Sequence, residues 1–193
     1  MSKDTTKDTT KDTTKDTTKD TTKDTTKDTT KDTTKDTTKD TNTFLTTRFT
    51  SETFNENMRY RDTNHVIIYS SALPISDKLP YKDYYVIEMN NSINKIMGIS
   101  KISKTLQPTE RIYSYRYYNR YTYKGTKYLQ IYDLHNNKSF LNEQEEKIIS
   151  EIEKKIFYGK GHIKRGSSYT SFPLFPSKHN EYIKPLISLI NNH

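Results

Sequence analysis

The chain has 193 residues, a net charge of +8 and no cysteine. The lack of cysteine excludes disulfides, thiolate chemistry and zinc sites built on cysteine. No apolar run approaches the roughly 20 residues of a membrane-spanning helix, and no hydrophobic signal-peptide segment follows Met1. We therefore expect an intracellular protein, cytoplasmic or nuclear, without a membrane partner.

The N-terminal fifth of the chain is a repeat. Residues 3–38 are nine perfect copies of Lys-Asp-Thr-Thr, and a tenth begins at Lys39. The repeat offers no aliphatic or aromatic side chain, so burial cannot offset the roughly 1–2 kcal/mol per residue that backbone ordering costs. We predict a disordered tail over residues 1–42 and a single globular domain over residues 43–193. The tail suits a spacer, although a modified threonine tract or a partner-binding array stays open.

The net charge belongs to the predicted domain. The tail holds ten Lys and ten Asp, which leaves 22 basic and 14 acidic residues in residues 43–193. Abundant Lys, Asn, Ile and Tyr with no Trp are typical of an AT-rich genome, as in large DNA viruses, so a virion location is a further interpretation. A basic domain favours an anionic partner, above all nucleic acid.

The first half of the domain is predicted to be mostly extended. Residues 43–62 suit a short helix or an irregular lead-in, and residues 65–70 and 84–89 are short apolar runs typical of strands. Turn residues at 90–92 then lead into a strand over residues 95–102, which predicts a hairpin.

Within the strand at residues 95–102, alternation predicts two faces. Ile96, Ser100 and Ile102 would share one face, while Met97 and Ile99 would share the other. Gly98 in the strand interior predicts a bulge or a close backbone approach.

The second half predicts another hairpin and two helices. Residues 121–123 and 128–132 would pair around a turn at residues 124–127, and residues 168–172 would form a last strand. Asn142 and Glu145 form a capping box for a helix that ends at Gly159. Its apolar stripe comprises Ile148, Ile149, Ile152 and Ile156.

The C-terminal helix would begin regularly only near Lys184, because Pro185 disfavours a helix interior. Its apolar residues are Tyr182, Ile183, Leu186, Ile187 and Ile190. Together these elements predict an α+β fold, a small, mainly antiparallel, barrel-like sheet with flanking helices, preceded by the disordered tail.

The strongest functional candidate is the segment 111–124, which holds six Tyr and four basic residues and no acid. Cations displace counterions from phosphates, and aromatic rings stack on unpaired bases. A second basic segment lies at residues 160–169. We therefore predict a non-enzymatic domain that binds RNA or single-stranded DNA. From these two segments, the predicted contact residues are Arg111, Tyr115, Arg116, Tyr117, Arg120, Tyr121, Lys124, Lys160, Lys164 and Arg165.

The same segment has a structural interpretation. Tyrosine is favoured in strands, so the rings could pack over a sheet while the Arg and Lys side chains are merely solvated. In that case the chain would be a structural or virion-associated interaction protein that binds no nucleic acid.

Three segments carry a resemblance to a known family. Residues 65–71 (HVIIYSS), 96–102 (IMGISKI) and 164–173 (KRGSSYTSFP) are similar in order and type to PUA-like domains of the EVE and YTH type. The resemblance implies a small barrel-like sheet that binds nucleic acid, often at an aromatic cage. It implies that Tyr69 and Ser70 lie near a pocket, and that Gly98 lets the backbone approach a base. The chain departs from the family in having no Trp for the cage.

Enzymatic interpretations have less sequence support. The five His residues show no zinc-binding spacing, and no cofactor or metal site is predicted. A metal-dependent nuclease is a second alternative, but it rests only on positive charge and on scattered acids. Those acids are Asp62, Asp77, Asp83, Glu88, Glu110 and Asp133.

Overall fold

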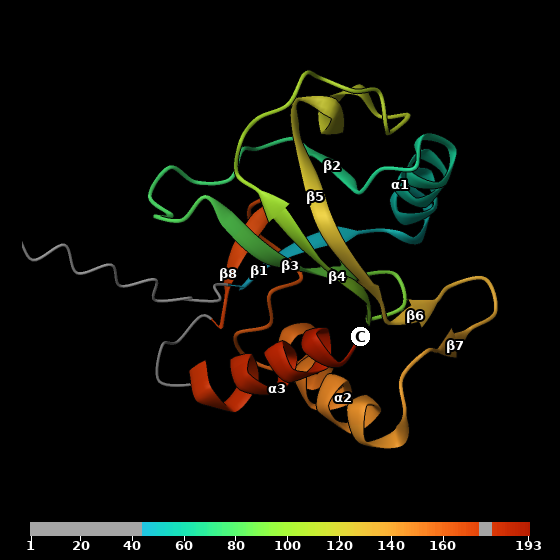
Figure 1. The fold of residues 1–193 in the computed structure, drawn as a ribbon, viewed down its shortest axis with the longest axis vertical. Helices are drawn as coiled ribbons and strands as arrows, with labels where there is room; N and C mark the ends of the chain where they lie inside the picture. The colour runs from blue at the N-terminus through green and yellow to red at the C-terminus, as the bar shows by residue number, and fades with distance from the viewer. Residues whose placement is uncertain (1–43, 174–178) are drawn as a thin grey trace, which may run out of the picture. The chain divides into compact units, whose positions relative to one another are not determined.

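The computed structural model describes residues 44–173 and 179–193, and the predicted disordered tail at residues 1–42 lies outside them. The described residues fall within one compact unit. Six strands form a curled, half-barrel sheet in the order β2-β5-β4-β3-β1-β8. All neighbouring pairs are antiparallel except β1 with β3, so the sheet is mixed but mainly antiparallel. The predicted α+β class with a barrel-like sheet is confirmed (Figure 1).

The sheet strands are β1 (Phe44–Phe49), β2 (Ile68–Ser71), β3 (Asp83–Asn90), β4 (Lys95–Ser103), β5 (Tyr121–Gln130) and β8 (Tyr169–Phe172). A small separate hairpin consists of β6 (Tyr132–Asp133) and β7 (Lys138–Ser139). The helices are α1 (Ser51–Asn64), α2 (Glu143–Phe157) and α3 (His179–Asn192), with a 3-10 turn η1 (Arg116–Asn119).

The two faces of the sheet bury separate apolar clusters. On one face α2 and α3 pack side by side, and Ile152, Ile156 and Leu186 are buried with Phe44 and Ile99 of the sheet. The other face lies against α1, where Phe54 joins Leu45, Val86 and Ile102 (Figure 1). The sheet is therefore covered by helices from two sides.

The lead-in at residues 43–62 contains more structure than predicted. From residue 44 onward it forms the buried strand β1 and most of α1. Thr50 caps α1 in a capping box with Thr53, whose backbone N–H donates to the Thr50 hydroxyl at 3.1 Å. A sharp change from strand to helix is thus fixed by one local pair of threonines.

The predicted β3–β4 hairpin is confirmed, including the bulge. The register shifts beside Gly98, and this corrects the predicted faces: Ile96 and Ile99 belong to one apolar cluster, and Met97 and Ile102 to the other. A Cβ at Gly98 would lie 2.5 Å from Tyr128 Cε2. Gly98 therefore makes room for the Tyr128 ring.

The predicted second hairpin is wrong, because residues 121–130 form the one continuous strand β5. Its first part pairs with β2 and its second part with β4, and the register shifts near Gly125. A Cβ at Gly125 would meet Ile67 Cγ2 at 2.5 Å, so this glycine serves a close packing contact within a strand.

The two predicted helices have different outcomes. For α2 the Asn142 cap, the Glu145 capping box and the buried isoleucines are confirmed, with Ile148 half-buried. The start of α3 near Lys184 is wrong, because the helix already begins at His179 and continues through Pro185. Burial of Ile183, Leu186 and Ile190 outweighs the hydrogen bond that proline cannot donate.

Candidate functional site

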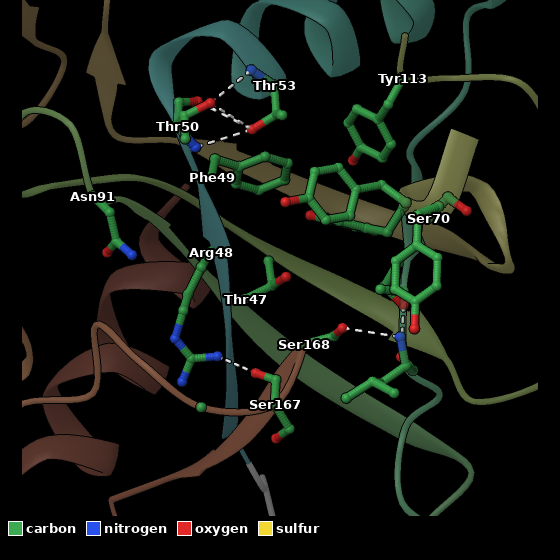
Figure 2. A pocket seen from close by; sticks show the side chains of 17 residues that line it. Thr47, Arg48, Phe49, Thr50, Thr53, Ser70, Asn91, Tyr113, Ser167 and Ser168 are labelled. Carbon is green, nitrogen blue, oxygen red and sulfur yellow. Dashed lines mark hydrogen bonds between the residues drawn. The ribbon is translucent and has the colours of Figure 1, made fainter. Parts of the chain in front are cut away.

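A cavity of about 410 Å³ lies where the end of β2 approaches the loop before β8. It is lined by residues 47–50, 69–73 and 166–168, with Thr53, Asn91, Tyr113, Tyr117 and Tyr118. We call it the main cavity. In Figure 2, Arg48 lies on one side of it, Tyr113 and Ser70 lie on the other, and Thr47 and Ser168 lie between them.

Polar contacts between distant segments hold the rim of the main cavity. The Leu73 backbone N–H donates to the Ser168 hydroxyl at 3.1 Å, which joins the end of β2 to the loop before β8 (Figure 2). The Asn91 side-chain amide donates to the Lys164 carbonyl at 2.9 Å, and the Asn91 backbone N–H donates to the Phe49 carbonyl at 2.8 Å. The rim is therefore a preformed structure.

Arg48 is the only charged residue among those that line the main cavity. Its Nε donates to the Ile163 carbonyl at 2.6 Å and its Nη2 to the Thr170 hydroxyl at 2.7 Å. Its Nη1 donates to the Ser167 carbonyl (Figure 2). Burial lowers the pKa of Arg48, but an arginine remains charged at neutral pH. All three acceptors are neutral.

The opposite side of the main cavity belongs to the Tyr-rich segment. Tyr115, Tyr117 and Tyr118, here called the tyrosine cluster, are 63%, 48% and 42% exposed. The Tyr115 and Tyr118 ring centroids are 5.1 Å apart in an edge-on arrangement. The Arg120 guanidinium lies 5.0 Å from the Tyr117 ring centroid. Aromatic faces and a cation are therefore combined on one exposed surface.

A buried asparagine explains why these rings point outward. The Asn119 side-chain oxygen accepts from the backbone N–H groups of Ile112 and Tyr113 at 3.0 and 2.9 Å. Its amide donates to the Tyr113 carbonyl at 2.7 Å. Asn119 thus closes the segment into a compact loop. The Ser114 backbone N–H also donates to Glu56 Oε1 at 3.0 Å, which ties the loop to α1.

Tyr69 connects the main cavity to a buried charge network beneath it. Its hydroxyl donates to Glu88 Oε1 and contacts the Ser100 hydroxyl. Glu88 forms an ion pair with Arg61 at 2.9 Å. Burial raises the pKa of the Tyr69 hydroxyl well above its ordinary value. Tyr69 is therefore a neutral, fixed part of the cavity lining.

The structure brings together only some of the predicted contact residues. Tyr69, Ser70 and Tyr117 line the main cavity. Arg120 lies beside Tyr117, and Tyr121 is half-buried with its ring centroid 5.8 Å from the Arg120 guanidinium. The other predicted contact residues also lie outside the lining, and all of them are exposed except the half-buried Lys164: Arg111, Tyr115, Arg116, Lys124, Lys160, Lys164 and Arg165.

Sequence reasoning missed several lining residues. Arg48, Asn91 and Tyr113 reach the main cavity only because β1, the β3–β4 turn and the Tyr-rich segment meet in space. Gly166 could have been suspected, because it is a glycine that directly follows Lys164 and Arg165 in a basic segment. In the structure it has a φ of 130°.

The described residues give the nuclease alternative no geometric support. Over residues 44–173 and 179–193, no group of three His, Asp or Glu side chains is arranged to hold a metal ion. In the same part of the chain, no helix is long and apolar enough to cross a membrane.

Comparison of the chain with protein-family models, with curated proteins and with solved structures gives no match.

Proposed function

We propose that the domain binds single-stranded nucleic acid, RNA or single-stranded DNA, without catalysing a reaction. The observation that carries this proposal is the tyrosine cluster, three exposed rings with Arg120 alongside, at the edge of a cavity that contains an arginine and no acid. Exposed aromatic faces stack on unpaired bases at roughly 1–3 kcal/mol per base.

Charge supports the same partner. All of the +8 net charge belongs to residues 43–193. Arg111, Arg116 and Arg120 are exposed within the same segment as the tyrosine cluster. Exposed arginines contact phosphates along a strand, while the rings contact its bases.

We also propose a relationship to PUA-like domains. Two of the segments that carry the resemblance contribute to the main cavity, through Tyr69 and Ser70 and through Gly166. The curled sheet is compatible with this relationship. The tyrosine cluster would then take the place of the missing Trp, although its rings form part of one cavity wall and not a closed cage.

The test separates the charge contribution from the stacking contribution. Changing Arg116 and Arg120 to Ala should flatten the dependence of log affinity on log salt, by about 0.7 for each lost phosphate contact. Changing Tyr115 and Tyr117 to Ala should weaken binding and leave the slope nearly unchanged, because stacking releases few ions. Tyr121 is left intact because it is half-buried.

The matched control is Lys138→Ala with Phe140→Ala, a cation and a 52%-exposed ring near the β6–β7 hairpin. This pair should change neither affinity nor slope. Binding is measured by fluorescence anisotropy with labelled single-stranded RNA and DNA at about 100 mM salt and below. Absence of binding, or equal effects of all three double variants, would contradict the proposal and favour a surface for a protein partner.

A further inference from the structure

We infer that the main cavity is an anion site and, building on the proposed function, that it takes a phosphate group of the bound nucleic acid. The first step is charge balance. Arg48 makes none of the ion pairs found in the described part of the chain. Its hydrogen-bond acceptors are two carbonyls and a hydroxyl. Its positive charge is therefore half-buried and not neutralised by any acidic residue in the described part of the chain.

The second step concerns hydrogen-bond donors. A guanidinium has five N–H groups, and Arg48 uses one on each nitrogen for the three acceptors named above. One N–H therefore remains on Nη1 and one on Nη2. Each of these two N–H groups can donate a charge-assisted hydrogen bond to an anion oxygen, a stronger bond than one between neutral groups.

The third step concerns the loop beside Arg48. The backbone N–H groups of Gly166 and Ser167 donate to no acceptor found in the described residues. Gly166 has a φ of 130°, and a Cβ on it would lie 3.5 Å from Arg48 Nη2. The glycine therefore permits a backbone conformation that an L side chain rarely adopts, directly beside the guanidinium.

The fourth step is the choice of anion. The volume of about 410 Å³ is in the range of sites for small ligands and exceeds what a bare carboxylate needs. Thr47 and Ser168, which carry hydroxyls, lie between Arg48 and the side that holds Ser70 and Tyr113 (Figure 2). The rings of Tyr117 and Tyr118 also line the cavity. A nucleotide has both required parts, a tetrahedral phosphate for Arg48 and the loop, and a base for the rings.

The test uses the full chain and follows its backbone amides by NMR. Inorganic phosphate should move the Gly166 and Ser167 amide signals saturably. A nucleoside monophosphate should move the same signals at about tenfold lower concentration, because the base adds contacts with the tyrosine cluster. The matching nucleoside without phosphate should leave them unmoved. If neither phosphate nor the monophosphate moves these signals, the inference is overturned.

Variants locate the site. Arg48→Gln should abolish the phosphate response, and the rest of its amide spectrum reports whether it still folds. Gly166→Ala is the second variant, because it disturbs the loop while keeping all three Arg48 acceptors. Lys138→Ala removes an exposed cation elsewhere and should respond as the wild type does. If both cavity variants respond to phosphate as the wild type does, or if Lys138→Ala loses the response equally, the bound phosphate is an adventitious ion only and the inference is overturned.

Oligonucleotides distinguish the source of the phosphate and keep the two proposals separate. If an oligonucleotide with a terminal phosphate moves the amides of Gly166 and Ser167 and its hydroxyl-ended counterpart does not, the site takes a terminal monoester. Equal responses assign an internal phosphodiester. If oligonucleotides bind without moving these amides, the proposed function stands and the phosphate site fails. If phosphate binds and oligonucleotides do not, the anion site stands and the proposed function fails.

Discussion

Glu88 carries a carboxylate that is 0% exposed, and its partner Arg61 is 5% exposed. Burial alone would lower the pKa of Arg61, but the attraction of Glu88 raises it, so the pair remains ionic. The Arg61 guanidinium also lies 4.5 Å from the Tyr69 ring centroid and 5.1 Å from that of Tyr128. Two charges thus join α1 to β3, and aromatic rings of β2 and β5 pack around them.

Removing only one of the two charges of this ion pair should strongly destabilise the fold. Glu88→Gln leaves the Arg61 charge buried without a counter-ion, so the free energy of unfolding should fall by about 3–5 kcal/mol. The double variant Arg61→Met with Glu88→Gln leaves no buried charge and should be more stable than Glu88→Gln alone. Urea unfolding followed by circular dichroism measures both. A loss below about 1 kcal/mol in Glu88→Gln would mean that water reaches the pair.

Elements defined by local signals could be predicted from sequence, and elements defined by distant partners could not. α2 has its cap, capping box and apolar stripe within one segment. In contrast, the polar stretch at residues 124–127 resembles a turn but stays extended, because β2 and β4 pair with successive parts of β5. β1 was missed for a similar reason: its partners are β3 and β8, and it is parallel to β3.

The residues of the candidate site also divide into those that local sequence indicates and those that depend on distant contacts. The Tyr-rich segment stands out by composition alone, and the family resemblance singled out Tyr69 and Ser70. Arg48 is different, because its role depends on contact with Ile163, which is 115 positions away. Only a fold that brings β1 against the loop before β8 makes Arg48 a cavity residue.

At the scale of one element, substitutions on the buried side of α2 should lower the stability of the protein more than substitutions on its partly exposed side. Ile152 is 1% exposed between α2 and the sheet, so Ile152→Ala should lower the free energy of unfolding by about 2–5 kcal/mol. Ile148→Ala removes the same atoms from a half-buried position of the same helix and should cost distinctly less. Thermal and urea unfolding compare the two variants. Equal losses would show that helix propensity, and not packing, sets the stability of α2.

At the scale of the whole molecule, the tyrosines include an exposed group and a buried group. The tyrosine cluster faces solvent, while Tyr69, Tyr113, Tyr169 and Tyr182 are buried on the two faces of the sheet. Burial raises the pKa of all four above the ordinary value. For Tyr182, burial and a hydrogen bond with Glu181 raise the pKa to about 12. The interior therefore depends on neutral phenols drawn from both apolar clusters.

This distribution predicts alkaline unfolding. A tyrosine whose pKa is higher in the folded than in the unfolded state stabilises the fold fully below the unfolded value of about 10. That contribution is lost as the pH rises through the folded value, which for Tyr182 is about 12. The free energy of unfolding should thus be level near pH 8 and fall between about pH 10 and pH 12.

The variant Tyr182→Phe isolates one contribution to this fall. It keeps the ring that packs against Phe172 and removes the ionisable hydroxyl, so stability should fall less steeply above about pH 10 than in the wild type. Urea unfolding at a series of pH values measures both slopes. Tyr117→Phe is the matched control, because its ring is exposed, and it should follow the wild-type curve. If Tyr182→Phe and the wild type lose stability in parallel, ionisation of Tyr182 is not coupled to unfolding.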